Sequence, residues 1–547
     1  MLVNEWGALS ECAARLKSKS VAQLFEADPG RSQRYSLEFS GYYLDFAKQR
    51  IDDQAWGALC DLARISGLPC AIKKLVCGEV VNPTENRPAL HTALRAAPKA
   101  FDLKDASIAE SVAQSLSKMA SIVAKIYSKQ WRGFSGKAIT DIVNIGVGGS
   151  DLGPFMTCHA LDEFSTDEAR RLNMHFVSSM DGTQIFQVLE HLDPATTLFI
   201  VSSKSFTTID TFYNANTAIA WLMDSVADRQ VIMRHHVIAI SASPEKMNAW
   251  GVPESNQLLF WEWVGGRFSM WSAIGLPIAI KIGMDNFLAL LDGAHEMDVH
   301  FATAPFEQNM PVIMGLLGVW NATFLGINAH TVLPYDGRLR FLPNYLTQLE
   351  MESNGKSVTN DGETVEFKTC PILWGDVGPN AQHAFYQLLH QGTQEVSCDF
   401  IAPVMRYHKV EGASSVGART SLAEQQCLAL ANCLAQSRVL AFGNHAVADD
   451  SDSEVYKRYR GNQPSTTLLM DELTPRFLGG LLAAYEHKVF VMATLWNINP
   501  FDQWGVELGK NIAKQTQAAL KGEGSFLFDS STDALIKRIQ AKANTAS

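Results

Sequence analysis

The sequence lacks several features that mark specialised classes of protein. Its nine cysteines are scattered from Cys12 to Cys433 without a C-x-x-C pair, so they predict neither a disulfide framework nor a zinc site. It has no block of like charge, and 57 acidic residues outnumber 46 basic ones for a net charge of −11. This balance argues against nucleic acid or an anionic membrane as partner. The cysteine usage fits a reducing cytoplasm best.

Secretory and membrane-spanning segments are also missing. The N-terminal stretch carries an acid at Glu5 and has no apolar signal core, so we do not expect secretion. Residues 311–327 form an uncharged, mostly apolar run, but Asn321, three glycines and the absence of flanking basic anchors distinguish it from a membrane span. The run therefore predicts a fully buried helix of a large protein.

The sequence offers little for a metal or a redox cofactor. The stretch from His295 to His300, H-E-M-D-V-H, resembles a metalloprotease helix, but its histidines are five residues apart and point to different faces at about 100° per residue. We expect an exposed helix there. Nothing else groups His, Cys and carboxylates at ligand spacing, so we expect neither a metal nor another cofactor.

What the chain does have is size and an alternating pattern. With 547 residues, 47% of them hydrophobic, it can bury a large core. Short β-branched runs alternate with longer helical patterns, which is typical of parallel βαβ units and an α/β fold. The strands that we expect are residues 139–145, 174–178, 197–202, 236–240, 331–333, 372–374, 400–404 and 439–442.

Two α/β lobes are the simplest organisation for this pattern. We expect the first lobe near residues 113–285 and the second near 286–510, packed together because no low-complexity linker separates them. Residues 1–112 are predicted to be a mainly helical segment packed on the lobes, and residues 511–547 a helical tail.

A glycine-rich turn follows the first predicted strand. Residues 141–154 read D-I-V-N-I-G-V-G-G-S-D-L-G-P. A dinucleotide fingerprint G-x-G-x-x-G would need its third glycine where Asp151 stands, and a P-loop would need G-K-[ST], which is absent. A nucleotide-dependent oxidoreductase is therefore disfavoured. The exposed N–H groups and the Ser150 hydroxyl at a helix start remain suited to an anion or sugar oxygens.

A second loop strengthens the case for a phosphate. Residues 201–211 read V-S-S-K-S-F-T-T-I-D-T and place several hydroxyls around the single cation Lys204, at another strand-to-helix junction. Ligands of open α/β sheets bind at the carboxyl ends of the strands, where both loops are expected. The pair of loops predicts a phosphosugar pocket.

These stretches carry a resemblance to a known family. The two loops are similar to those of the glucose-6-phosphate isomerase (phosphoglucose isomerase) family, whose members consist of two sugar-isomerase-type (SIS) lobes. The match continues in order along most of the chain: E-N-R-P-A-L-H-T-A-L-R at 85–95, G-G-R-F-S-M-W-S-A-I-G-L at 265–276, Q-L-E-M-E-S-N-G-K at 348–356, Q-H-A-F-Y-Q-L-L-H-Q-G-T at 382–393 and F-D-Q-W-G-V-E-L-G-K at 501–510.

The resemblance implies an aldose–ketose isomerase of glucose 6-phosphate and fructose 6-phosphate that works through ring opening and an enediolate. Glu352 matches the base that moves a proton between neighbouring carbons, and Arg267 matches the group that stabilises the enediolate. His383 and Lys510 match the pair that assists opening of the sugar ring. The positions that match substrate contacts are Ser150, Ser203, Lys204, Ser205, Thr208, Gln348 and Gln503.

The resemblance also implies a homodimer with shared sites, in which the residue matching His383 comes from the partner chain. The sequence departs from the family pattern at Ser205, Pro379 and Ser179, where threonine, threonine and asparagine are expected. The hydroxyl survives at Ser205, so phosphate binding should persist. A non-catalytic sugar-phosphate-binding regulator with the same lobes remains the alternative, although it would have no reason to keep the four catalytic positions in their motifs.

Overall fold

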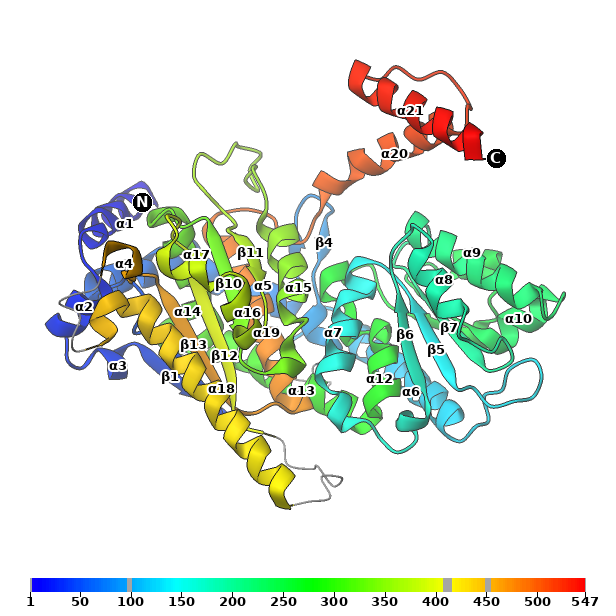
Figure 1. The fold of residues 1–547 in the computed structure, drawn as a ribbon, viewed down its shortest axis with the longest axis horizontal. Helices are drawn as coiled ribbons and strands as arrows, with labels where there is room; N and C mark the ends of the chain where they lie inside the picture. The colour runs from blue at the N-terminus through cyan, green and yellow to red at the C-terminus, as the bar shows by residue number, and fades with distance from the viewer. Residues whose placement is uncertain (1, 96–100, 407–415, 448–453, 547) are drawn as a thin grey trace. The chain divides into compact units, whose positions relative to one another are not determined.

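The computed structural model divides the chain into two compact units, residues 1–500 and residues 501–547. The residues that it describes are 2–95, 101–406, 416–447 and 454–546 (Figure 1). All the strands of this described part belong to the first unit, in two main sheets and one two-stranded ribbon. The fold is therefore α/β, as the alternating pattern predicted.

The first sheet has five parallel strands in the order β6-β5-β7-β8-β9. Their bounds are β5 (Asp141–Ile145), β6 (Asn173–Val177), β7 (Thr197–Ser202), β8 (Val237–Ser241) and β9 (Gln257–Leu259). The four strands predicted in this region are confirmed to within two residues. Every residue of β7 is buried, because helices cover both faces of the sheet and a parallel strand then needs an unbroken apolar run.

Helices flank this sheet on both sides (Figure 1). They are α6 (Ser107–Tyr127), α7 (Leu152–Ala160), α8 (Thr183–Leu189), α9 (Ile209–Met223), α10 (Arg229–His236), α11 (Pro244–Trp250) and α12 (Leu276–Ile282). Ile145 and Phe199 from the strands pack in one buried cluster with Ile185 of α8 and Leu222 of α9. The strand order is that of a doubly wound sheet whose switch point lies between β5 and β7, where ligands of such sheets bind.

The second sheet repeats this order in its parallel part. Its strands are β1 (Ser36–Phe39), β2 (Tyr42–Asp45), β10 (Ala329–Pro334), β11 (Ile372–Gly375), β12 (Ser397–Met405) and β13 (Ser465–Glu472), arranged as β1-β2-β13-β12-β10-β11. The parallel order β11-β10-β12-β13 corresponds to β6-β5-β7-β8 of the first sheet. The chain therefore contains two lobes of the same topology.

The helices of the second lobe include a buried central pair, α14 and α19. The bounds are α13 (Met284–Thr303), α14 (Met310–Val319), α15 (Leu342–Thr347), α16 (Gly378–Ala384), α17 (Tyr386–Gln391), α18 (Val416–Phe442) and α19 (Pro475–Leu495). Helix α14 and the π turn η9 (Trp320–Phe324) occupy the apolar run, and the prediction of a buried helix is confirmed. Across the described ranges, the structure contains no helix both long and apolar enough to span a bilayer.

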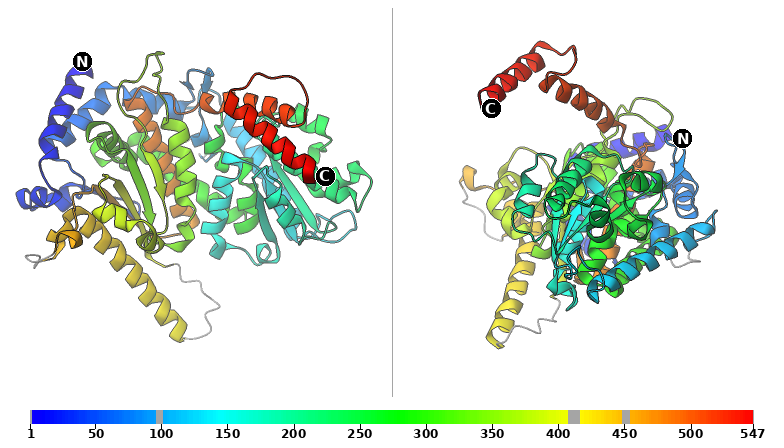
Figure 2. Two further views of the ribbon diagram at one scale, coloured as in Figure 1. Left: turned by 45° about the horizontal axis from the view of Figure 1, so that its top comes forward. Right: turned by 90° about the vertical axis from the view of Figure 1, so that its right-hand side faces the viewer.

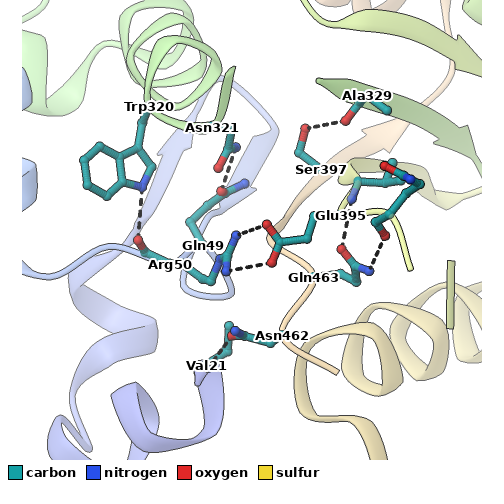
Figure 3. Close-up of polar contacts among 12 residues, drawn as sticks. Val21, Gln49, Arg50, Trp320, Asn321, Ala329, Glu395, Ser397, Asn462 and Gln463 are labelled. Carbon is teal, nitrogen blue, oxygen red and sulfur yellow. Dashed lines mark hydrogen bonds and ion pairs between the residues drawn. The ribbon is translucent and has the colours of Figure 1, made fainter. Parts of the chain in front are cut away.

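The N-terminal segment packs on the second lobe. It consists of α1 (Leu2–Lys17), α2 (Val21–Ala27), α3 (Arg31–Arg34), α4 (Asp53–Ile65) and α5 (Leu68–Cys77), with β1, β2 and the ribbon β3 (Val80–Asn82) and β4 (Arg87–Pro88). Figure 3 shows how it is attached: Asn321 Nδ2 donates to Gln49 Oε1 at 3.0 Å, and Arg50 pairs with Glu395 at 3.1 Å. These contacts make the segment part of the lobe.

The hairpin of β1 and β2 was not predicted, because this region looked mainly helical. Its two-residue turn has Ser40 at φ 50° and Gly41 at φ 82°, the geometry that matches the twist of a tight hairpin. Strand β2 then pairs antiparallel with β13. Strand β13 was missed too, because its first half is polar. That half is buried between β12 and this distant segment, from which Gln49 Nε2 donates to Thr466 Oγ1 at 2.9 Å.

The strand predicted at residues 439–442 is wrong, because these residues form the last turn of α18. A run of four apolar residues does not distinguish a strand from a buried helix turn. Cys433, Leu440 and Ala441 recur at helical spacing and are buried, with the first two packed in the core of the second lobe. Towards its N-terminus α18 extends away from the rest of the first unit (Figure 2).

The second unit contains the turn η14 (Trp504–Val506) and the helices α20 (Glu507–Leu520) and α21 (Ser530–Ala546). Gln540 Nε2 on α21 donates to the carbonyl of Ala519 at 2.9 Å and joins the two helices. The helical C-terminal extension is thus present. The bounds of the four segments drawn from the sequence remain predictions.

Candidate active site

The glycine-rich turn after β5 makes close contact with two other segments. Gly148 has φ 61° in the 3₁₀ turn η2 (Gly148–Ser150), and a Cβ there would lie 2.9 Å from Gln348 Nε2. A Cβ on Gly149 would lie 1.9 Å from the carbonyl oxygen of Gly266. The glycines are required because backbone must approach backbone at this point. The turn thereby meets the segment that carries Arg267.

The residue after this turn is a buried carboxylate. Asp151 is 8% exposed, and its Oδ1 has no hydrogen-bond partner among the residues that the structure describes. Burial raises the pKa of Asp151 to about 6. Next to it, the Ser150 carbonyl accepts a bond from Asn144 Nδ2 at 3.1 Å, which fixes the end of the turn on β5.

The loop after β7 presents hydroxyl groups in pairs. Ser203 Oγ lies 2.9 Å from Thr208 Oγ1, and Ser205 Oγ lies 2.8 Å from Thr207 Oγ1. Phe206 between them has φ 50°, an uncommon conformation for a bulky residue, and its ring is buried. Because β7 neighbours β5, this loop and the glycine turn flank the switch point of the sheet.

Lys204 in this loop is engaged by a residue that the sequence did not single out. Its Nζ donates to the carbonyl of Glu262 at 2.8 Å and lies 3.4 Å from the Glu262 carboxylate. Burial lowers the pKa of Lys204, and the charge of Glu262 opposes that shift. The Glu262 carboxylate also accepts from Arg87 Nη1 at 2.7 Å. The cation of the phosphate loop therefore already has a counter-ion.

The proposed base lies on a π turn. Helix α15 widens into the π turn η11 (Gln348–Glu352), a form of helix found mostly at functional sites. Glu352 Oε2 accepts from Gln348 Nε2 and from Arg267 Nη1, each at 3.2 Å. Its side chain is 22% exposed, so the carboxylate is partly desolvated but reachable. The predicted base Glu352, the predicted enediolate stabiliser Arg267 and the predicted substrate contact Gln348 are brought together here.

Arg267 is more deeply buried than Glu352 and has more hydrogen-bond partners. The side chain is 1% exposed, its Nε donates to Ser353 Oγ at 2.6 Å, and its Nη2 donates to the carbonyl of Pro500. It belongs to the 3₁₀ turn η6 (Gly266–Trp271), which starts where the glycine turn touches Gly266. A guanidinium fixed by three partners is a preorganised positive charge beside the carboxylate.

A buried ion pair lies under the π turn. Glu350 pairs with Lys488 of α19 at 2.9 Å, and both side chains are at most 4% exposed. Nearby, Asp399 accepts from Tyr485 at 2.9 Å and lies 3.1 Å from His330 Nε2. These charges line a cavity of about 20 Å³. The sequence did not predict this pair, because nothing local distinguishes Glu350 from an exposed helix residue two positions before the predicted base Glu352.

A second buried cluster supports the other side of the site. Arg95 pairs with Asp298 and with Glu486, at 2.6 Å each, and Trp271 Nε1 donates to Glu486 at 2.8 Å. Trp271 is the last residue of η6, so the cluster anchors the turn that carries Arg267. Arg95 was visible only as part of a family motif.

This cluster corrects one expectation. The stretch from His295 to His300 was expected to be an exposed helix, but Asp298 is 0% and His300 8% exposed within α13. Helix α13 is buried there because α19 packs along it and Arg95 supplies the compensating charge. Within the described ranges, no group of three or more His, Cys, Asp or Glu side chains is placed to hold a metal ion.

Three of the predicted residues are not among the contacts described above. His383 is exposed on α16, and its side chain has no hydrogen bond or ion pair with the described part of the chain. Gln503 and Lys510 belong to the second compact unit, where Lys510 Nζ pairs with Glu507 at 2.7 Å across one turn of α20. Their part in a site stays a prediction.

The three departures from the family pattern are compatible with the local structure around them. Ser205 keeps its hydroxyl bonded to Thr207, and the Ser179 carbonyl accepts from Asn214 Nδ2 at 2.9 Å. Pro379 stands in the first turn of α16, where a missing N–H costs nothing.

Comparisons with known proteins agree with this geometry. Residues 45–536 match the profile of the family described as phosphoglucose isomerase. The glucose-6-phosphate isomerase of Psychrobacter cryohalolentis is 57% identical over 538 residues, covering 96% of this chain and 95% of that protein. The glucose-6-phosphate isomerase of Hydrogenovibrio crunogenus is 54% identical, with 98% of each chain covered.

A solved structure is similar over the whole length. The crystal structure of a glucose-6-phosphate isomerase from Chlamydia trachomatis superposes with a TM-score of 0.84 at 31% identity and covers 99% of both chains. Sequence and fold thus point in the same direction.

Proposed function

Because the chain belongs to the phosphoglucose isomerase family, we propose that it catalyses the reversible isomerisation of D-glucose 6-phosphate to D-fructose 6-phosphate. The observation that carries the proposal is that Arg267 and Gln348 both donate to the Glu352 carboxylate, and that Gln348 lies against the glycine turn at the sheet's switch point. A base, a fixed cation and an anion-binding turn are the parts that this reaction needs.

Substrate binding falls to the two loops of the first lobe. Dense hydroxyls and free backbone N–H groups suit the phosphate, and Lys204 adds a charge. Gln348 and Gln503 contact the sugar hydroxyls. The phosphate-binding residues of this proposal are Ser150, Ser203, Lys204, Ser205 and Thr208.

The chemistry consists of proton transfers. His383 and Lys510 move a proton from the anomeric hydroxyl to the ring oxygen while the bond between C1 and that oxygen breaks. Glu352 then takes the proton from C2, and the resulting negative charge on O1 is stabilised by Arg267. Glu352 returns the proton to C1 as the hydroxyl proton of O2 passes to O1, which completes the ketose. No step consumes a metal or a redox cofactor.

We place the working enzyme in the cytoplasm as a homodimer with shared sites, in which His383 of one chain serves the Glu352 of the other. The exposure of His383 supports this arrangement, since no partner of its own chain engages it in the described part. Its helix α16 is joined to α18 by the bond from Gln382 to Asn432, and α18 exposes Leu428 and Leu434. Exposed apolar residues on an extended helix suit a subunit contact.

A coupled assay tests the activity. Purified protein should convert fructose 6-phosphate to glucose 6-phosphate, with the product detected by a dehydrogenase, and should keep its rate after treatment with a metal chelator. Saturable phosphosugar binding without turnover would instead establish the alternative, a non-catalytic regulator. Activity lost on chelation and restored by metal would overturn the mechanism.

Mixed dimers test the shared site. Glu352→Gln and His383→Ala homodimers should both be nearly inactive, because each defect is present in both sites. After joint unfolding and refolding of an equal mixture, random pairing leaves about a quarter of all sites intact. Recovery near that fraction supports the exchange of residues between chains. No recovery despite mixed dimers seen by native mass spectrometry would mean that both residues act within one chain.

A further inference from the structure

Lys204 has a counter-ion within the protein before any phosphate arrives. Its Nζ donates to the Glu262 carbonyl at 2.8 Å and lies 3.4 Å from the Glu262 carboxylate. The Lys204 side chain is only 28% exposed, and burial lowers its pKa. A half-buried ammonium group without an anion is costly, so this contact stabilises the empty loop.

Glu262 does not depend on Lys204 to stay in place. Arg87 Nη1 binds the same carboxylate at 2.7 Å, and the rings of Trp261 and Trp263 on either side of Glu262 stack at 4.8 Å with an 8° angle. The Trp263 carbonyl also accepts a bond from the N–H of Leu90 at 3.1 Å. The carboxylate is therefore held by its own segment, and it keeps Arg87 as a partner if Lys204 turns away.

The contact is also weak enough to exchange. The Glu262 side chain is 54% exposed, and ion pairs at such exposure contribute at most about 1 kcal/mol. An ammonium group has three donors, so Lys204 can keep its bond to the Glu262 carbonyl while it turns another N–H towards a new anion. Ser203, Ser205 and Thr208 add hydroxyl donors to such an anion, which the carboxylate of Glu262 does not use.

We propose that Glu262 is a competing counter-ion of the phosphate site, whose carboxylate occupies Lys204 in the empty site and is exchanged for the phosphate when substrate binds. The inference rests on the proposed function, because it takes Lys204 as a phosphate ligand. The exchange lowers the affinity for every anion by the strength of one ion pair. A phosphate recovers that loss through the hydroxyls, whereas a carboxylate or another small monoanion exchanges one weak pair for another.

Calorimetric titration with inorganic phosphate at constant ionic strength tests the exchange directly. The Glu262→Gln variant keeps the shape and the backbone carbonyl but removes the competing charge. It should bind phosphate about two- to five-fold more tightly than the parent, and the KM for fructose 6-phosphate should fall by a similar factor. Acetate, as a monoanionic probe, should gain affinity by about the same factor, because both anions lose the same competitor for Lys204.

Two further variants separate a local exchange from a general change of charge. Glu85→Gln removes a neighbouring carboxylate that also pairs with Arg87, at 3.5 Å, but forms no hydrogen bond or ion pair with Lys204 within the described residues, and it should raise phosphate affinity less than Glu262→Gln does. In a Lys204→Met background, Glu262→Gln should have no effect on phosphate binding. Equal effects of Glu85→Gln and Glu262→Gln would overturn the specific exchange.

The sign of the change decides the outcome. A folded Glu262→Gln protein, with the parent's Tm and circular dichroism, that binds phosphate less tightly or equally well would show that Glu262 only positions the loop. This result is distinct from failure of the proposed function, because calorimetry needs no turnover. A protein that shows the tighter binding but no isomerisation would refute the activity and leave the exchange intact.

Discussion

The loops of the first lobe and the π turn of the second hold their functional groups in opposite ways. After β5 and β7, the groups are backbone N–H and short hydroxyls, bonded to near neighbours in the sequence such as Ser203 with Thr208. On the π turn η11, the partners come from far along the chain: Arg267 pairs with Glu352, and Lys488 pairs with Glu350. Binding of an anion needs many modest donors, whereas a base needs one carboxylate in one place.

The difference also appears in burial. The ion pair of Lys204 with Glu262 is partly exposed, at 28% and 54% for the two side chains, but the pair of Glu350 with Lys488 is almost fully buried. Exposed pairs contribute little to stability, whereas loss of one partner from a buried pair leaves an uncompensated charge. We therefore expect the pair of Lys204 and Glu262 to exchange partners more readily than the pair of Glu350 and Lys488.

The largest effect is expected from the base itself. Glu352→Gln keeps the bonds to Arg267 and Gln348 possible but removes the proton acceptor, so kcat should fall by about 10²- to 10⁴-fold with little change in KM. The exposed Glu366→Gln serves as control and should match the parent. Exchange of the substrate's C2 proton with solvent at the parent rate in Glu352→Gln would assign the base to another residue.

Lys488→Met should cause the largest loss of stability. It leaves Glu350 charged and buried, so the free energy of unfolding should fall by about 3 to 5 kcal/mol in denaturant titrations. The double variant Glu350→Gln with Lys488→Met should recover most of that loss. Lys204→Met, the matched change in the first lobe, should cost about 1 kcal/mol or less because its pair is exposed. Equal losses for the two lysines would remove the contrast between the lobes.

Asp151, next to the glycine turn after β5, is an exception in the first lobe, because it is a carboxyl group that is only 8% exposed. Its pKa of about 6 exceeds the ordinary value of 3.8, so the folded state holds the proton more tightly than the unfolded chain. The corresponding stability is present below pH 3.8 and is lost as the pH rises through about 6. Asp151→Asn should therefore stabilise the protein at pH 7 by about 3 kcal/mol.

This advantage should disappear as the pH falls towards 4, which urea titrations across the pH range can follow. The exposed Asp167→Asn is the control and should change stability little at any pH. A gain from Asp151→Asn that is constant with pH would mean that titration of this carboxyl is not its cause.

The smallest of the four effects concerns Lys204. Lys204→Ala removes a charged hydrogen bond to the phosphate, but it also frees Glu262 from its partner. The KM should rise by about 10-fold, at the lower end of the 1.5 to 3 kcal/mol usual for such bonds, while kcat changes little. Initial rates with fructose 6-phosphate measure it, and a fall in kcat at constant KM would place Lys204 in the chemistry instead.

Much of the fold could be predicted from local patterns. The parallel strands β5 to β8 are short runs rich in apolar and β-branched residues, and the junctions after β5 and β7 show their glycines and hydroxyls directly in the sequence. The hairpin of β1 and β2 was missed because its region looked mainly helical, and strand β13 was missed because its pairing with β2 joins residues more than 400 positions apart. The last turn of α18 was misassigned because four apolar residues carry no period.

The sequence by itself determined the class of fold, the two polar loops at the strand ends and, through its motifs, the family; Glu352 as base and Arg267 beside it are its predictions. Only the tertiary structure decided which charges stand beside them: Glu262 on Lys204, Lys488 on Glu350, and Arg95 on Asp298 and Glu486. The physical reason is that a local sequence pattern reflects the conformational preferences of each residue and its near neighbours. The cost of burying a charge depends on groups that only folding brings within hydrogen-bond distance.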